Sequence, residues 1–182
     1  MYTVCEGAPA DPRAENEEAV YRFLQELDIP FTRIDHEAVH TMEDCAAVDR
    51  AMGGVICKNL FLCNQQKTAF YLLMLREDKP FKTKDVSKQL GVSRLSFASP
   101  EHMAQYLHIA PGAVSPMGLL FDSARDVRLI LDRDLLSEAF LGCHPCVNTA
   151  SIRLSMRDFL EKYLPATGHA PTLVTIAPPA AG

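Results

Sequence analysis

Residues 53–64 constrain the fold of this chain more than any other stretch. Two glycines open it, the apolar run Val55–Cys63 follows, and polar residues close it. A run of this length with such borders predicts a buried β-strand. Lys58 and Asn59 interrupt it, and because neighbouring strand residues face opposite sides, they cannot both point into the core. A buried lysine is costly unless it is paired, so Lys58 lies either at an exposed sheet edge or on a cleft.

The remaining pattern alternates hairpins with helices. The central strand and the next apolar run, 69–75, predict a hairpin at the centre of the sheet. This order favours an α+β fold with a mixed sheet, not a doubly wound parallel one. We expect helices from Asp11-Pro12 to before Pro30 and at 41–53, 83–90 and 99–107, a brief one at Asp134 and a last one from 155, with further strands at 31–35, 95–98, 119–121, 127–131, 140–143 and 147–154.

The chain has 182 residues, which is enough for one domain, 1–182. Residues 166–182 are rich in proline and alanine and are expected to form a loose tail with one short edge segment near 173–176. No apolar run approaches the roughly 20 residues that span a bilayer. The N-terminus also lacks the basic start and apolar core of a signal peptide. We therefore expect a cytoplasmic protein without a membrane partner.

The net charge of −5 argues against a general nucleic-acid binder. One stretch, 79–94, is nevertheless basic, with Asp85 as its one acidic residue. Such a local patch can meet phosphates while the whole chain stays acidic, and the alternative is a solvated helix face. The basic side chains of this stretch are Lys79, Lys82, Lys84, Lys88 and Arg94.

The motif Cys143-His144-Pro145-Cys146 allows a redox or a zinc interpretation. A redox CxxC needs a helix N-terminus to lower the thiol pKa, whereas Pro145 and the residues after it favour a strand or a turn. A structural zinc site needs a second ligand pair, which the sequence lacks. We therefore expect neither a metal nor a cofactor. His36 and His40 lie in the loop before the second helix. A surface position is the alternative for both and is favoured for His36, so that His40 is the candidate.

The loop 111–118 also has a plausible chemical use. Two prolines stiffen it, and Gly112 lets the backbone approach a ligand closely. A rigid turn with exposed backbone N–H groups can hold a carbonyl oxygen or its tetrahedral oxyanion. Taken alone, the loop could equally be a tight connection.

Taken together, four motifs resemble one known family. They resemble the YbaK family of aminoacyl-tRNA deacylases, also called the prolyl-tRNA synthetase associated domain, and within it the freestanding alanyl-tRNA(Pro) deacylases of the PrdX (ProX) type. The resemblance covers residues 14–170 and implies a mixed, barrel-like β-sheet flanked by helices. The motifs are Lys58-Asn59-Leu60-Phe61-Leu62, the run 90–99, Gly112-x-x-x-Pro116 with Gly118-Leu119, and His144-Pro145 with Asn148-Thr149.

This resemblance implies hydrolysis of the ester in mischarged tRNA(Pro), with Ala-tRNA(Pro) as the expected substrate. By this resemblance Lys58 holds the phosphate or ribose of the terminal adenosine, and Asn59 is its polar neighbour. Backbone N–H groups of the turn Gly112–Pro116 bind the acyl carbonyl, with Ala113, Val114 and Ser115 inside it. His144 positions or shapes the site. Asn148 and His40 are further substrate-binding candidates, and the basic stretch becomes a candidate contact for the acceptor stem.

The implied partners are the acceptor end of tRNA(Pro) and prolyl-tRNA synthetase, and the sequence leaves the oligomeric state open. Two other functions stay open as well. One is a non-catalytic module that binds tRNA or a synthetase, and the other is a Cys-tRNA(Pro) deacylase. Cys57 stands where family members often carry threonine, and cysteines flank His144-Pro145, so the size of the amino-acid pocket is also open.

Overall fold

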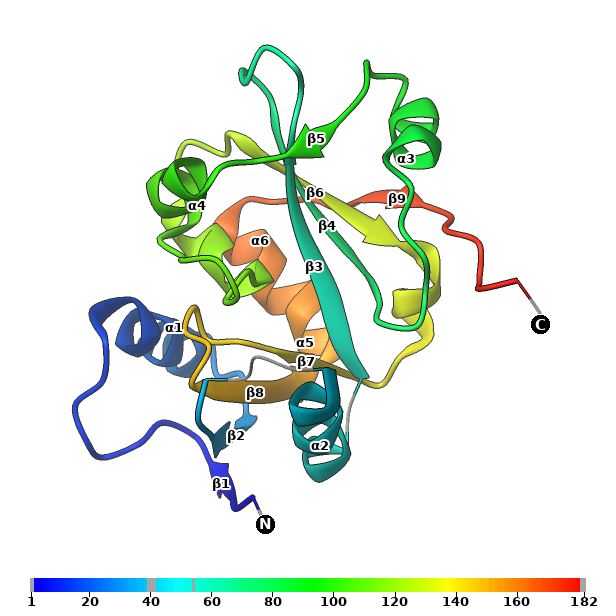
Figure 1. Ribbon diagram of the computed structural model, residues 1–182. Coiled ribbons are helices and arrows are strands. Elements are labelled where there is room, and N and C mark those ends of the chain that lie inside the picture. The colour runs from blue at the N-terminus through cyan, green and yellow to red at the C-terminus, as the bar shows by residue number, and fades with distance from the viewer. Residues whose placement is uncertain (1, 39–41, 54, 181–182) are drawn as a thin grey trace.

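The computed structural model describes residues 2–38, 42–53 and 55–180, and these form one mixed sheet of nine strands with helices packed around it (Figure 1). The strand order is β1-β2-β8-β7-β3-β4-β6-β9, and β5 pairs with β3. The elements are β1 (Val4–Glu6), α1 (Glu15–Glu26), β2 (Phe31–Asp35), α2 (Met42–Met52), β3 (Val55–Cys63), β4 (Phe70–Arg76), α3 (Thr83–Leu90), β5 (Ser96–Phe97), α4 (Pro100–Leu107), the 3-10 helices η1 (Pro116–Phe121) and η2 (Arg133–Ser137), β6 (Val127–Asp132), β7 (Phe140–Cys143), β8 (Ala150–Ser155), β9 (Thr172–Val174), and a last helix made of α5 (Met156–Asp158), the π-helical turn η3 (Phe159–Tyr163) and α6 (Leu164–Thr167).

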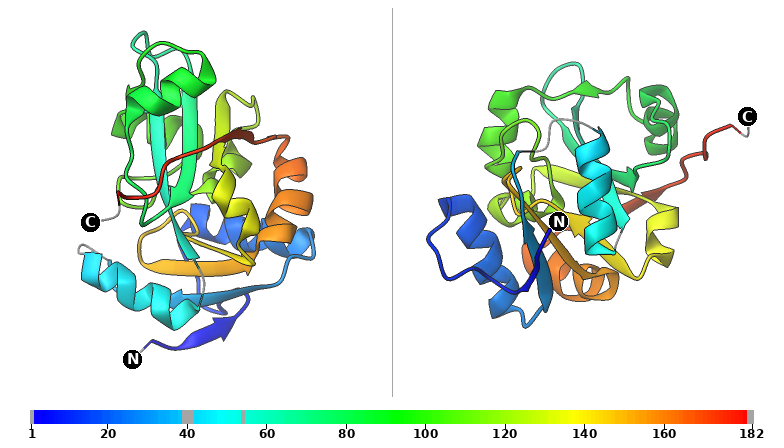
Figure 2. Two further views of the ribbon diagram at one scale, coloured as in Figure 1. Left: turned by 90° about the vertical axis from the view of Figure 1, so that its right-hand side faces the viewer. Right: turned by 60° about the horizontal axis from the view of Figure 1, so that its bottom comes forward.

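The predicted central strand and hairpin are confirmed, and β3 joins the two halves of the sheet. One edge of β3 pairs antiparallel with β4 from residue 57 to residue 63. The other edge pairs with β7 only at 55–56 and with β5 only at 62–63. Within the described part of the chain, residues 57–60 therefore have a strand partner on one side alone. Figure 2 shows the half that contains β8 turning away from the half that contains β4.

The two faces of β3 contact different cores. Cys57 and Phe61 face the larger core, which α1, α4 and the last helix cover. Leu62, with Leu60 packed beside it, faces a smaller core beneath α3. Alternation along the strand then places Lys58 on the face of Leu60 and Leu62, and Asn59 on the opposite face. No helix in the described ranges is both long and apolar enough to cross a membrane.

Three expected boundaries are wrong, and in two of these cases a local polar contact marks the start of the element. Helix α1 begins at Glu15, not at Asp11-Pro12, and the Arg13 amide donates to the Glu18 carboxylate ahead of it. Residues 119–121 are not a strand but the end of η1, which starts where Ser115 Oγ accepts the amide of Met117. Strand β8 begins at residue 150, three residues later than expected from 147.

The expected loose tail is also wrong as far as residue 176. Residues 172–174 form the edge strand β9, which pairs in parallel with β6, so the expected edge segment is confirmed. Before it, His169 is buried, and its Nε2 lies 2.9 Å from Asp122 Oδ2. After it, the Ile176 amide donates to Asp132 Oδ1 at 3.2 Å. These polar contacts hold a segment whose composition alone predicts little core.

Candidate active site

A cavity of about 300 Å³ opens near the part of β3 that pairs on one side only. It brings together five residues that the sequence assigned to one site: Lys58, Asn59, Gly112, Val114 and His144. The other lining residues are Cys45 of α2, Cys57 of β3, Glu77 of the turn after β4, Cys143 of β7 and Ser151 of β8.

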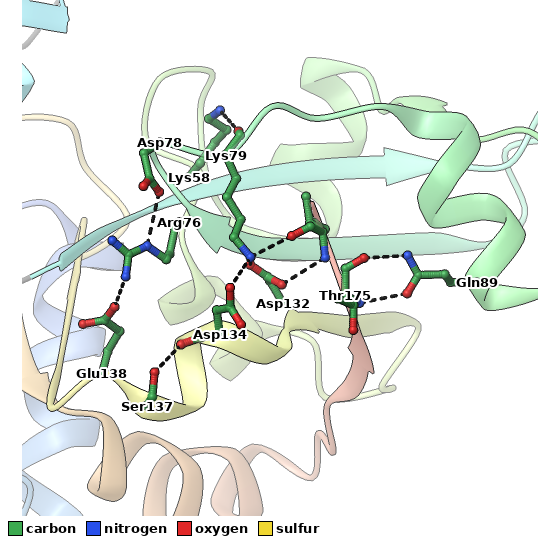
Figure 3. Close-up of polar contacts among 11 residues, drawn as sticks. Lys58, Arg76, Asp78, Lys79, Gln89, Asp132, Asp134, Ser137, Glu138 and Thr175 are labelled. Atoms are coloured by element: carbon green, nitrogen blue, oxygen red, sulfur yellow. Dashed lines mark hydrogen bonds and ion pairs between the residues drawn. The ribbon is translucent and has the colours of Figure 1, made fainter. Parts of the chain in front are cut away.

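Lys58 is half-buried, and its ammonium donates a hydrogen bond of 2.9 Å to the backbone carbonyl of Lys79 (Figure 3). In the described residues it forms no ion pair with a carboxylate. A carbonyl is a neutral acceptor, so it does not compensate the positive charge of the ammonium, which has two further N–H donors. Lys58 therefore offers an unneutralised cation at the wall of the cavity.

Lys79 itself is not available to a nucleic acid, which corrects its assignment as a tRNA contact. Its side chain is 4% exposed, and its ammonium lies 2.7 Å from Asp132 and 2.6 Å from Asp134. It also donates to the carbonyl of Ile176 at 2.8 Å. Burial lowers the pKa of Lys79, but the two carboxylates outweigh it and raise this pKa. The remaining residues of the basic stretch, Lys82, Lys84, Lys88 and Arg94, are exposed.

Asn59 leaves one polar atom unsatisfied. Its Nδ2 donates to the carbonyl of Cys57 at 3.2 Å, but its Oδ1 is buried and accepts no hydrogen bond from the described residues. A buried acceptor without a donor costs about 1–3 kcal/mol. Because Asn59 lines the cavity, a bound ligand with an N–H or O–H group would relieve this cost.

The turn before η1 presents free backbone amides. The amides of Gly112, Val114 and Ser115 donate no hydrogen bond within the described protein, whereas Ala113 N already donates to the carbonyl of Ala110 at 3.2 Å. Ala113 is also buried, so its amide does not fit the role expected for it, whereas the amides of Gly112 and Val114 stay free to donate. Gly112 has a φ of +88°, a conformation that glycine adopts without strain.

Hydrogen bonds fix this turn against its surroundings. Ser115 Oγ donates to the carbonyl of His144, and Tyr163 donates to the carbonyl of Pro116 at 2.8 Å. Ser115 and Pro116 are buried and do not line the cavity, so their side chains support the turn. Asn148 lies beside it, since a β-carbon added to Gly112 would stand 3.7 Å from Asn148 Nδ2.

His144 is held as a neutral imidazole. Its Nδ1 lies 2.8 Å from the carbonyl of Ala150, which can only accept, so Nδ1 carries a proton, and in the neutral ring Nε2 then keeps a lone pair. Burial lowers the pKa of His144, and His36 nearby lowers it further, against the opposite effect of the Ala150 carbonyl. A neutral ring with a free Nε2 can accept a hydrogen bond from water or from a hydroxyl group.

Sequence reasoning missed the polar wall on the side of β8 and α2. The hydroxyl of Ser151 lies 2.9 Å from His36 Nε2, while His36 Nδ1 donates to the carbonyl of Glu37. Glu77 of the cavity wall pairs with Asp49, and burial followed by this hydrogen bond raises the pKa of Asp49 to about 7. The sequence favoured a surface position for His36, whereas the structure places it against Ser151 of the cavity wall. His40, the histidine proposed as a candidate, lies outside the described residues.

The cysteines do not support the redox interpretation. All six are free, and Cys143 and Cys146 are buried. Burial raises the pKa of Cys143 to about 12 and that of Cys146 well above its ordinary value. A redox thiol needs the opposite shift. Among the described residues, no three histidine, cysteine, aspartate or glutamate side chains are grouped in a way that could hold a metal ion.

Comparison with known proteins gives consistent results. The family model described as an aminoacyl-tRNA editing domain matches residues 36–162. The chain is 36% identical to the prolyl-tRNA editing protein ProX of Acetoanaerobium sticklandii, over 84% of this chain and 92% of that protein. It is 34% identical to prolyl-tRNA synthetase associated domain-containing protein 1 of Danio rerio, over 92% and 89%. A solved structure described as a candidate trans-editing enzyme for prolyl-tRNA synthetase superposes with a TM-score of 0.68 at 19% identity, covering 91% of this chain and all of the other.

Proposed function

The chain belongs to the aminoacyl-tRNA editing domain family, and on this premise we propose that it is a trans-editing deacylase that hydrolyses the ester of mischarged tRNA(Pro), with alanine as the acyl group. One observation carries the proposal. A free cation, two free backbone amides and a neutral imidazole line the same small cavity. These groups match the phosphate or ribose, the acyl carbonyl and the attacking water of such a reaction.

The cation and the turn act on opposite ends of the substrate. Lys58 binds the phosphate or ribose of the terminal adenosine, because its ammonium has no carboxylate partner and has two further N–H groups that can donate. The amides of Gly112 and Val114 donate to the carbonyl oxygen of the aminoacyl group. As water adds, this oxygen becomes an anion, and fixed N–H donors stabilise it more than they stabilise the ground state.

The hydrolysis itself needs only a placed water. The water oxygen attacks the carbonyl carbon, the bond to the ribose oxygen breaks, and the ribose hydroxyl leaves with a proton. His144 Nε2 accepts a hydrogen bond from the water or the ribose hydroxyl and orients it. An aminoacyl ester is activated, so positioning and oxyanion stabilisation suffice without a strong base.

The size of the cavity determines which amino acid is accepted. Prolyl-tRNA synthetase cannot strongly reject alanine, because a pocket built for a larger apolar side chain discriminates weakly against a smaller one. A second site that admits alanine and excludes proline corrects the error. Cysteine is the alternative acyl group, since its side chain is also small. The acceptor end of tRNA(Pro) is the partner in either case, and a complex with prolyl-tRNA synthetase would deliver the substrate.

Deacylation of tRNA(Pro) carrying alanine, cysteine or proline tests the proposal with purified protein. We expect fast release of alanine and no release of proline above the spontaneous rate. Faster release of cysteine than of alanine would make Cys-tRNA(Pro) the preferred substrate, with the mechanism unchanged. Tight binding of tRNA without cleavage of any ester would contradict the enzyme and support the non-catalytic module instead.

A further inference from the structure

Two phenylalanine rings meet at the surface beside the face of β3 that carries Lys58. Phe97 of β5 is 63% exposed. Its ring centroid lies 6.1 Å from that of Phe81 in an edge-to-face arrangement. A single exposed phenylalanine is ordinary on a protein surface. The partner ring and the position relative to the proposed active site distinguish this one.

Strand pairing places the two rings in line with the proposed catalytic cation. Phe97 pairs directly with Leu62, so both side chains lie on the same face of the sheet. Lys58 is on that face as well, four residues earlier, at a distance of about 13 Å along the strand. Phe81 lies two residues after Lys79, whose carbonyl accepts the hydrogen bond from the Lys58 ammonium. The aromatic pair and Lys58 therefore lie on the same face of the sheet, with Leu60 between them.

Unpaired positive charges flank the two rings. Lys82 and Lys84 follow Phe81 in the chain, and Arg94 lies two residues before β5. All three are exposed, and none forms an ion pair with the described residues. Asp85 is the one acidic side chain within 79–94. An exposed ring with a half-buried partner ring, flanked by free cations, is a combination that binds single-stranded nucleic acid, because bases stack on the rings and phosphates meet the charges.

We propose that Phe81 and Phe97, flanked by Lys82, Lys84 and Arg94, bind the unpaired nucleotides that precede the terminal adenosine of the tRNA. Their bases stack on the two rings while the adenosine sits at Lys58. The rings favour the unpaired end over the acceptor duplex, because a paired and stacked base has no free face to offer. This assignment rests on the proposed function, since it takes the terminal adenosine to lie at Lys58 and places the preceding nucleotides of the same RNA strand outside the cavity.

Substrates of different length separate stacking from chemistry. We compare 2′(3′)-O-alanyl-adenosine, which lacks the preceding nucleotides, with an alanylated CCA trinucleotide and with Ala-tRNA(Pro). Phe97→Ala should lower kcat/KM by about tenfold on the two longer substrates, as expected for one lost base–aromatic stack, and leave alanyl-adenosine unchanged. Phe97→Trp should keep the wild-type values. A loss that is equal on all three substrates, or no loss on any, would overturn the proposal.

Phe140→Ala is the matched control. Phe140 is also exposed, at 41%, but it lies on β7, where Arg153 covers its ring. It should change none of the three rates.

A second arm uses binding alone. Fluorescence anisotropy with a labelled single-stranded RNA that ends in CCA should show weaker binding by Phe97→Ala and a smaller salt dependence for Lys84→Gln. If the wild-type protein hydrolyses none of the esters, the proposed function fails. The binding measurement still shows whether Phe97 takes part in binding single-stranded RNA. Unchanged binding by Phe97→Ala would then refute this role.

Discussion

Replacement of Lys79 by methionine removes the ammonium that neutralises a buried carboxylate. Asp132 is fully buried, and its carboxylate lies 2.7 Å from the Lys79 ammonium (Figure 3). Methionine fills nearly the same volume, so the change acts through charge and hydrogen bonding. It leaves Asp132 as a buried charge without its partner and deprives the carbonyl of Ile176 of a donor.

Removal of one partner from a buried ion pair costs about 3–5 kcal/mol. A domain of this size is commonly stable by about 5–15 kcal/mol, so the variant should fold but with a small margin. Each kcal/mol shifts the melting temperature by about 2–4 °C in chains of 150–250 residues. We therefore expect the midpoint of Lys79→Met to fall by roughly 6–20 °C. Urea denaturation, followed by circular dichroism and by tyrosine fluorescence, measures the loss of free energy.

Two companion variants show whether the buried charge is the cause. Lys79→Met/Asp132→Asn removes both charges and keeps the oxygen that accepts the Ile176 amide, so it should recover most of the stability. Asp134→Asn removes a partner whose side chain is 61% exposed and should cost much less than Lys79→Met. A Lys79→Met variant as stable as the wild type, or a double variant less stable than the single one, would refute the reasoning.

Three further predictions concern the cavity. Gly112→Ala and Gly7→Ala both place alanine at a positive φ, so each variant should lose about 1–2 kcal/mol of stability. Only Gly112→Ala should also lower kcat/KM for deacylation. Equal kcat/KM values for the two variants would contradict the role of the turn. The pKa of Asp49, about 7 when folded, lies above its unfolded value of about 3.9, so the folded state binds more protons and the free energy of unfolding should fall as pH rises from about 4 to 7. Asp49→Asn should flatten this slope in urea titrations at several pH values, and an unchanged slope would show that another group causes it. Cys143→Ser should keep its deacylation rate within a few-fold, whereas a redox role requires its loss.

Local sequence was sufficient where short-range physics decides the structure. The apolar run around Lys58-Asn59 has strand length and strand borders, and the structure makes it β3 with the expected bounds. Ser99-Pro100 gave the start of α4, because the serine side chain accepts the amide of His102 as an N-cap. Gly112 was identified for its backbone freedom, and it has the positive φ that requires glycine.

Long-range contacts could not be predicted from the sequence in this way. Lys79 belongs to a basic run, but its carboxylate partner Asp134 is 55 residues away in sequence. No local pattern distinguishes such a buried ion pair from a solvated charge. Glu77 and Ser151 reach the cavity only because β4 and β8 are placed on either side of β3 by the sheet order. Their positions follow from strand pairing, which a single sequence does not specify.

The central claim is that the cation of Lys58 works together with the amides of the facing turn to cleave an aminoacyl ester. Release of alanine from Ala-tRNA(Pro) by Lys58→Ala tests this claim most directly, with circular dichroism and thermal unfolding as checks of the fold. We expect a folded variant whose kcat/KM is lower by about 100-fold or more, because the ester is no longer held in position against the turn. A folded Lys58→Ala protein that releases alanine at the wild-type rate would contradict it.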